Sequence, residues 1–172
     1  MHLGTLRKSE AATTLTEVLV ASVLVAVFFA TIYEVNAVCL RYISASKENV
    51  AAIECVQDRI EQLRNLDFGS LTNGTTVATA MAAPSNASVL AQQATEDVII
   101  STFSAASGAA TTPKVQYHRV GGGAASTTWT GGPGFGTATI VQVDVTYTWT
   151  STFGGHTRSE QTSTILAAGT KK

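Results

Sequence analysis

Three histidines are the residues of this chain with the widest chemical repertoire, because imidazole can bind a metal or transfer a proton near neutral pH. They are His2, His118 and His156, and their spacings are unrelated to one another. No cysteine or carboxylate stands around them at the spacing of a zinc site. The serines lack the G-x-S-x-G context of an activated nucleophile. The sequence therefore predicts neither a bound metal nor an enzyme.

Two glycine clusters, at residues 121–123 and 131–132, could belong to a phosphate-binding loop. Such a loop needs a Lys-Ser or Lys-Thr pair after the glycines and a helix N-terminus to receive the anion. Neither follows these glycines. We therefore expect an irregular surface loop across residues 121–136, and no nucleotide or other cofactor.

The two cysteines, Cys39 and Cys55, are sixteen residues apart. In one continuous helix that separation is about 24 Å, which exceeds the reach of a disulfide. The sequence leaves two interpretations open: both are small buried apolar residues, or they take part in a contact between subunits.

One carboxylate stands where a charge is costly. Glu17 immediately precedes sixteen uncharged residues, 18–33. An ionised group buried in hydrocarbon beside such a segment costs several kcal/mol or more unless it is paired. We therefore expect Glu17 to have a cationic partner.

Charge and composition differ between the two ends of the chain. Charged residues make up 13% of it, and most of them lie in the first 67 positions, whereas Thr, Ser, Ala and Gly dominate the rest. The formal net charge is −1, and no basic stripe exists that could neutralise phosphates. The composition favours a membrane-associated first part and gives no reason to expect nucleic acid as a partner.

A single long helix is predicted across residues 13–67, because these 55 residues contain neither Pro nor Gly. Its length would be about 80 Å. Residues 18–33 are apolar all round, which suits lipid or the centre of a helix bundle. The second half is amphipathic, and its apolar residues at spacings of three or four predict a stripe that packs on a sheet: Val50, Ile53, Val56, Ile60 and Leu63.

The charged residues on the other faces of this second half, among them Lys47, Arg59 and Arg64, predict a solvated surface. The helix should end at residues 67–69, where Gly69 can supply a left-handed terminating conformation.

Shorter elements are predicted beyond the helix. Residues 75–83, 97–104 and 114–120 are predicted as strands, and residues 89–94 as a short helix. The strongest strand signal is residues 140–149, which are rich in β-branched and aromatic side chains and place Val141, Val143, Val145 and Tyr147 on one face. A glycine pair at 154–155 then indicates a hairpin turn, with residues 157–168 returning antiparallel.

The junction at Glu17 resembles the type IV prepilin signature, which type IV pilins share with the pseudopilins of type II secretion. Its usual form is a Gly, an aromatic residue and then T-L-I-E-V, after a short basic leader. Aligned on Glu17, Thr14 and Leu15 stand in their family places. Ala12 then replaces the Gly before the cleavage point, and Thr13 replaces the aromatic first residue of the mature chain. A third departure is the threonine at position 16, which replaces a branched apolar residue.

A second stretch, "AAIECVQDRIEQLRNLDF" at residues 51–68, is similar to the end of the long helix in minor pilins and in one class of minor pseudopilins. The resemblance covers about the first 70 residues of the chain.

The resemblance implies an α+β fold, the type IV pilin-like ladle, in which one long N-terminal helix packs on a small antiparallel sheet. Residues 1–12 would be a leader, 13–40 the hydrophobic transmembrane or filament-core part, and 41–172 the amphipathic helix and β-rich head domain. Processing would fall between Ala12 and Thr13, and Glu17 would act in subunit assembly.

The resemblance also implies a function as a structural filament subunit, a minor pilin or a pseudopilin of a secretion or competence system. The expected partners are other such subunits, the prepilin peptidase and the inner membrane. The head would be periplasmic before the subunit enters a cell-surface or periplasm-spanning filament.

Two other classes remain open. In a secreted protein, residues 18–33 would be the apolar region of a signal peptide, with residues 35–37 as the cleavage site. Glu17 argues against this class, because a charge there weakens the start of the apolar region. A single-pass membrane protein that displays a β-rich binding module fits every feature except the need for Glu17.

Overall fold

The structure, a computed structural model, describes residues 6–169, with side chains from Thr14 onward. The chain divides into two compact units, residues 1–43 and 44–172. The first helix, α1 (Leu6–Asn65), contributes residues to both units. We call residues 44–169 the head.

The first unit consists of the N-terminal part of α1. All side chains described in it, residues 14–43, are exposed, and large apolar groups such as Leu24, Phe28 and Phe29 are among them. α1 is long and apolar enough to cross a membrane. A helix suits that environment because it satisfies its backbone hydrogen bonds internally.

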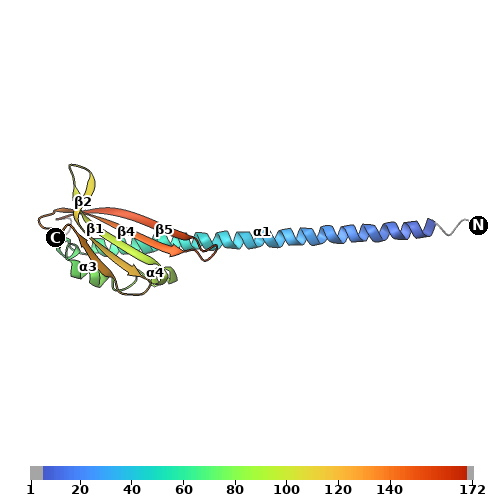
Figure 1. Ribbon diagram of the computed structural model, residues 1–172, viewed down its shortest axis with the longest axis horizontal. Helices are drawn as coiled ribbons and strands as arrows, with labels where there is room; N and C mark the ends of the chain where they lie inside the picture. The colour runs from blue at the N-terminus through green and yellow to red at the C-terminus, as the bar shows by residue number, and fades with distance from the viewer. Residues whose placement is uncertain (1–5, 170–172) are drawn as a thin grey trace, which may run out of the picture. The chain divides into compact units, whose positions relative to one another are not determined.

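The head contains one five-stranded antiparallel sheet in the order β3-β2-β1-β4-β5. Figure 1 shows the strands side by side, with the second part of α1 along them. Residue Asp97 at the centre of the sheet pairs with His118 of β2 and Thr146 of β4. The strands are β1 (Thr95–Ser104), β2 (Ala109–Val120), β3 (Ser126–Thr130), β4 (Ile140–Thr150) and β5 (Thr157–Ala167).

Three short helices connect α1 to the sheet, and each begins at a side chain that caps it. Asp67, Asn73 and Ser88 accept hydrogen bonds from backbone N–H groups two or three residues ahead, which satisfies donors that a helix start leaves unpaired. The helices are α2 (Phe68–Leu71), α3 (Gly74–Ala80) and α4 (Val89–Gln93).

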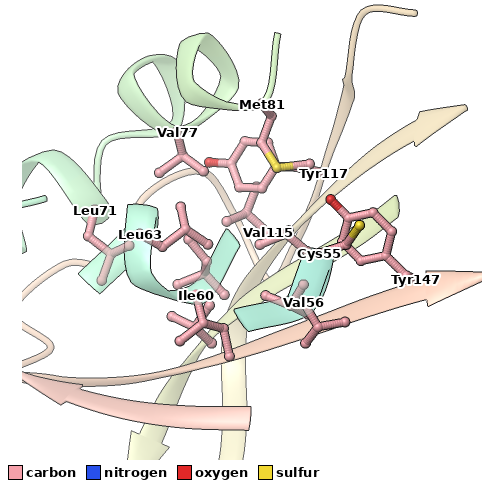
Figure 2. Packing of buried hydrophobic residues seen from close by; sticks show 14 of the residues in the cluster. Cys55, Val56, Ile60, Leu63, Leu71, Val77, Met81, Val115, Tyr117 and Tyr147 are labelled. Carbon is pink, nitrogen blue, oxygen red and sulfur yellow. The ribbon is translucent and has the colours of Figure 1, made fainter. Parts of the chain in front are cut away.

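The hydrophobic core lies between the second part of α1 and one face of the sheet. Val56, Ile60 and Leu63 of α1 are buried in it. Figure 2 shows these side chains converging with Val77 of α3 and with residues of the sheet. On β4 the residues predicted to share one face are all buried: Val141, Val143, Val145 and Tyr147. The predicted α+β fold, a long N-terminal helix packed on an antiparallel sheet, is confirmed.

The predicted stripe on α1 is wrong at its first two positions. Val50 and Ile53 expose 52% and 41% of their surface. Ala52 and Cys55 are buried in their place. Ala52, Val56 and Arg59 are buried at the three- and four-residue spacing of one helix face, so the buried face lies to one side of Val50 and Ile53.

Three local predictions are also wrong. Residues 75–83 form α3 and the turn after it, because the cap at Asn73 starts a helix there. α1 ends at Asn65, and Gly69 lies within α2 without a left-handed conformation. Residues 121–136 were expected to be irregular, but they contain the edge strand β3, which pairs with β2.

The burial of residues along α1 predicts that two aspartate substitutions differ in their effect on the free energy of unfolding. Ile60 is 8% exposed, so Ile60→Asp places an unpaired carboxylate in the core and should lower the free energy of unfolding by several kcal/mol. Ile53→Asp introduces the same charge on the exposed face and should change it by less than about 1 kcal/mol. Thermal unfolding of both variants, followed by circular dichroism, measures the difference; equal melting temperatures would contradict this packing.

Candidate functional site

Glu17 lies on α1 with its side chain exposed, at the start of the apolar segment, residues 18–33. Among the residues that the structure describes, no cation forms an ion pair with it. The leader residues 1–5, and the side chains of Ala12 and Thr13, lie outside the described part, so the processing site stays a prediction from the sequence.

A buried ionic cluster in the head was not predicted. Glu96 of β1 binds Arg59 of α1 and Arg119 of β2, and all three side chains are 0% exposed. Arg59 Nε lies 2.5 Å from Glu96 Oε1, and Arg119 Nη2 lies 2.7 Å from Glu96 Oε2. The expectation that Arg59 belongs to a solvated face is therefore wrong. One carboxylate pairs with two guanidinium groups: Arg119 stands opposite Glu96 in the β1–β2 register, and Arg59 comes from α1.

The remaining donors of Arg119 bind backbone carbonyls, and those of Arg59 bind two backbone carbonyls and one side-chain amide oxygen. Arg59 donates to the carbonyls of residues 80 and 83 at 2.8 and 2.7 Å, and to Gln62 Oε1 at 2.9 Å. Arg119 donates to the carbonyls of Ala91, at 3.0 Å, and Gly121. These carbonyls belong to the segments around α3 and α4 and to the turn after β2. The cluster thus ties α1, the sheet and the connecting segments together.

Two buried tyrosines lie in the same core. Burial raises the pKa of the Tyr117 hydroxyl to about 12. Burial, and then the negative charge of Glu96, raises the pKa of Tyr147 well above its usual range. Tyr147 donates to Ser85 Oγ at 2.8 Å, and Tyr117 donates to the Gly74 carbonyl at 3.3 Å. Both hydroxyls are therefore neutral hydrogen-bonding groups and cannot act as bases near neutral pH.

A second polar contact joins α1 to the turn between β4 and β5 and to the start of β5. The Thr152 N–H donates to Glu48 Oε1 at 3.0 Å, and Arg158 Nη1 donates to Asn49 Oδ1 at 3.2 Å. Hydrogen bonds from Thr152 hold the pKa of Glu48 below its usual range, with smaller contributions from Ser151 and Trp149. A pocket of about 470 Å³ lies beside this contact.

The histidines form no metal site among the described residues. His118 Nδ1 lies 2.8 Å from Asp97 Oδ1 on the face of the sheet that carries no helix, and Gln116 donates to the same oxygen at 2.9 Å. His156 follows the glycines of the β4–β5 turn, and the structure does not bring it to His118.

The cysteines differ in environment. Cys55 is buried, and its Sγ lies 3.4 Å from Ser88 Oγ and 3.7 Å from Asn86 Oδ1. Cys39 is exposed on the first unit. The interpretation as a small buried residue therefore holds for Cys55, whereas for Cys39, which is exposed in the single chain, a contact between subunits stays a prediction.

Comparison of the chain with protein-family models, with curated proteins and with solved structures gave no match.

The buried cluster predicts that one isosteric substitution, Glu96→Gln, strongly lowers the free energy of unfolding. Glu96→Gln removes the only carboxylate of the cluster and leaves two buried guanidinium groups without a counter-charge, so the free energy of unfolding should fall by about 3–5 kcal/mol. The control is Glu61→Gln, because Glu61 pairs with Arg64 at the surface, where both side chains are more than half exposed. Glu61→Gln should lower the free energy of unfolding by no more than about 1 kcal/mol. Urea unfolding of the two variants provides the comparison, and similar losses would contradict the role of Glu96.

Proposed function

We propose that this protein is a structural subunit of a type IV pilus-like filament, either a minor pilin or a pseudopilin, assembled through its N-terminal helix. The observation that carries the proposal is Glu17, a single carboxylate at the start of an exposed apolar segment. The prepilin-like residues around Glu17 and the α+β head support it.

The free-energy cost of exposing apolar side chains to water favours lipid or other apolar helices as the surroundings of the first unit. An apolar helix with all its described side chains exposed is stable only in lipid or among other apolar helices. A carboxylate in either place needs a partner of opposite charge. Cleavage before Thr13 would create an α-amine that is positively charged near neutral pH. In a staggered bundle the amine of one subunit could reach Glu17 of its neighbour.

Such a pair would select the register of the helices. A subunit in register pairs the two charges, whereas a subunit out of register leaves a carboxylate in hydrocarbon. Before assembly the subunit would lie in the inner membrane with its head in the periplasm. Its partners would be the prepilin peptidase and other subunits of the filament.

The first test concerns processing. A prepilin peptidase should cut the chain between Ala12 and Thr13, so the mature protein should lack the first twelve residues. Mass spectrometry of the N-terminal peptide identifies the cut. A mature start at Val38 would show a secretory signal peptide instead, and an intact N-terminus would favour the membrane-anchored binding module.

The second test concerns Glu17. Glu17→Ala should leave membrane insertion and folding of the head intact, because the side chain lies outside the head, and should lower incorporation into filaments about tenfold or more, the effect of losing a pairing of about 1.4 kcal/mol or more. The measurement is the share of the protein in sheared filaments relative to the membrane pool. Glu34→Ala, at the other end of the apolar segment, is the matched control and should assemble normally. Normal incorporation of Glu17→Ala with normal processing would contradict the pairing.

A further inference from the structure

An asparagine–glycine pair, Asn73 and Gly74, stands where α3 begins, and α3 is labelled in Figure 1. Asn73 is the chain's one asparagine that a glycine follows. In such a pair the backbone nitrogen of the glycine can attack the side-chain amide carbon of the asparagine, because glycine has no Cβ to hinder the approach. The reaction is deamidation. It takes place in the head and does not depend on the proposed filament function.

The fold leaves both reacting groups of this pair accessible. Asn73 is exposed, and its Nδ2, the leaving group, has no hydrogen-bond partner among the described residues. The Gly74 N–H, which supplies the nucleophile, is one of the first-turn donors that a helix leaves unpaired, and within the described part of the chain no acceptor binds it. Water therefore reaches the amide, and hydroxide can remove the Gly74 proton.

A backbone contact activates the amide carbon that is attacked. The Thr75 N–H donates to Asn73 Oδ1 at 3.0 Å. Negative charge develops on Oδ1 during the attack, and a backbone N–H already aimed at this oxygen stabilises that charge, as in an oxyanion hole. The hydrogen bond that caps α3 therefore also lowers the barrier to deamidation.

The packing of α3 on the sheet requires the glycine of this pair. A Cβ at Gly74 would lie 3.2 Å from Trp129 Cζ2. Tyr117 donates to the Gly74 carbonyl at 3.3 Å, which holds the residue at this close distance from the sheet. A bulkier residue that would slow the attack on Asn73 therefore does not fit here.

Asn86 provides a comparison within the same head. Its Nδ2 donates to Asp58 Oδ2 at 2.6 Å, and its side chain is half-buried. The residue that follows it is Ala87, whose methyl group hinders the approach of the backbone nitrogen. The fold thus protects Asn86 and leaves Asn73 reactive.

We propose that Asn73 is a deamidation site of the folded head, with water as the co-reactant. Hydroxide removes the Gly74 amide proton, and the nitrogen forms a bond to Asn73 Cγ. The bond from Cγ to Nδ2 then breaks, and Nδ2 takes up a proton from water and leaves as ammonia. Water hydrolyses the resulting cyclic imide at one of its two C–N bonds, which yields aspartate or isoaspartate at this position.

The two products differ in their effect on α3. Aspartate caps a helix about as well as asparagine, so it preserves the start of α3 and adds one negative charge to the surface. Isoaspartate routes the backbone through Cβ and Cγ, so Oδ1 becomes a main-chain oxygen and no longer caps the Thr75 N–H. The main chain is then one atom longer before Gly74, which should shift this residue away from Trp129.

The experiment incubates the full chain in detergent micelles at neutral and at mildly alkaline pH and follows the reaction by mass spectrometry. Trypsin should release residues 65–114 as one peptide, because no Lys or Arg lies between Arg64 and Lys114. This peptide contains both Asn73 and Asn86, so its fragmentation locates any gain of about one dalton. Asn73 should deamidate at a rate proportional to the hydroxide concentration, while Asn86 stays unchanged. An isoaspartate methyltransferase labels the isoaspartate product.

Two controls separate the effect of the fold from that of the sequence. A synthetic peptide of residues 68–80 gives the rate of the same pair without the head. The folded chain should react at least as fast as this peptide, because the Thr75 N–H is already placed on Asn73 Oδ1. Asn73→Ser keeps a capping side chain, so it should leave the melting temperature unchanged, and it should abolish the mass gain at this position.

Two results would overturn the proposal. One is a rate of deamidation at Asn73 that is lower in the folded chain than in the peptide, because the fold would then protect the amide. The other is deamidation of Asn86 at the same rate as Asn73, which would show that the reaction passes through the unfolded chain.

Discussion

The head depends on one buried carboxylate, Glu96, that pairs with two buried arginines, Arg59 and Arg119. A guanidinium has five N–H donors, and burying it is favourable only if they find acceptors in the correct geometry. Arg59 makes five hydrogen bonds, two of them to Glu96 and two to the carbonyls of residues 80 and 83, at the end of α3 and after it. Arg119 likewise binds Glu96 and two carbonyls outside the sheet. Because these carbonyls must sit within reach of fixed donors, the cluster determines the path of chain segments that have little regular structure of their own.

Elements that carry one strong local signal could be predicted from the sequence. The absence of Pro and Gly predicted α1, and the alternation of residues 140–149 predicted β4 with its buried face. A prediction was wrong where a residue distant in sequence determines the environment of a side chain. Arg59 is surrounded in sequence by charged residues, so its local pattern indicates a solvated face, whereas its partner Glu96 lies 37 positions later on another element. Similarly, residues 75–80 contain threonine and valine, which favour a strand, yet the capping side chain of Asn73 starts a helix.

The candidate site was predictable to different degrees. Glu17 stands out in the sequence because a charge beside sixteen uncharged, mostly apolar residues needs an explanation. The pocket beside Glu48 had no such signal, because its lining comes from α1, α4 and the end of β4, which are up to 105 positions apart. Only the folded head brings Trp149 and Ser151 to the carboxylate of Glu48. Residues that form a site through tertiary contacts leave no spacing pattern along the chain.

Glu17 and Glu96 present the same physical problem, since each is a carboxylate among apolar residues. Glu96 pairs with two arginines within the head, so the contact can form as soon as the head folds. For Glu17, no ion pair is present among the described residues, and those near it in the helix are uncharged from position 18 to 33. If this segment is buried in lipid or in a bundle, its counter-charge must come from the chain's own terminus or from another molecule. Folding of the head and burial of the helix are then separate steps, and the second step is the one that a neighbouring subunit can control.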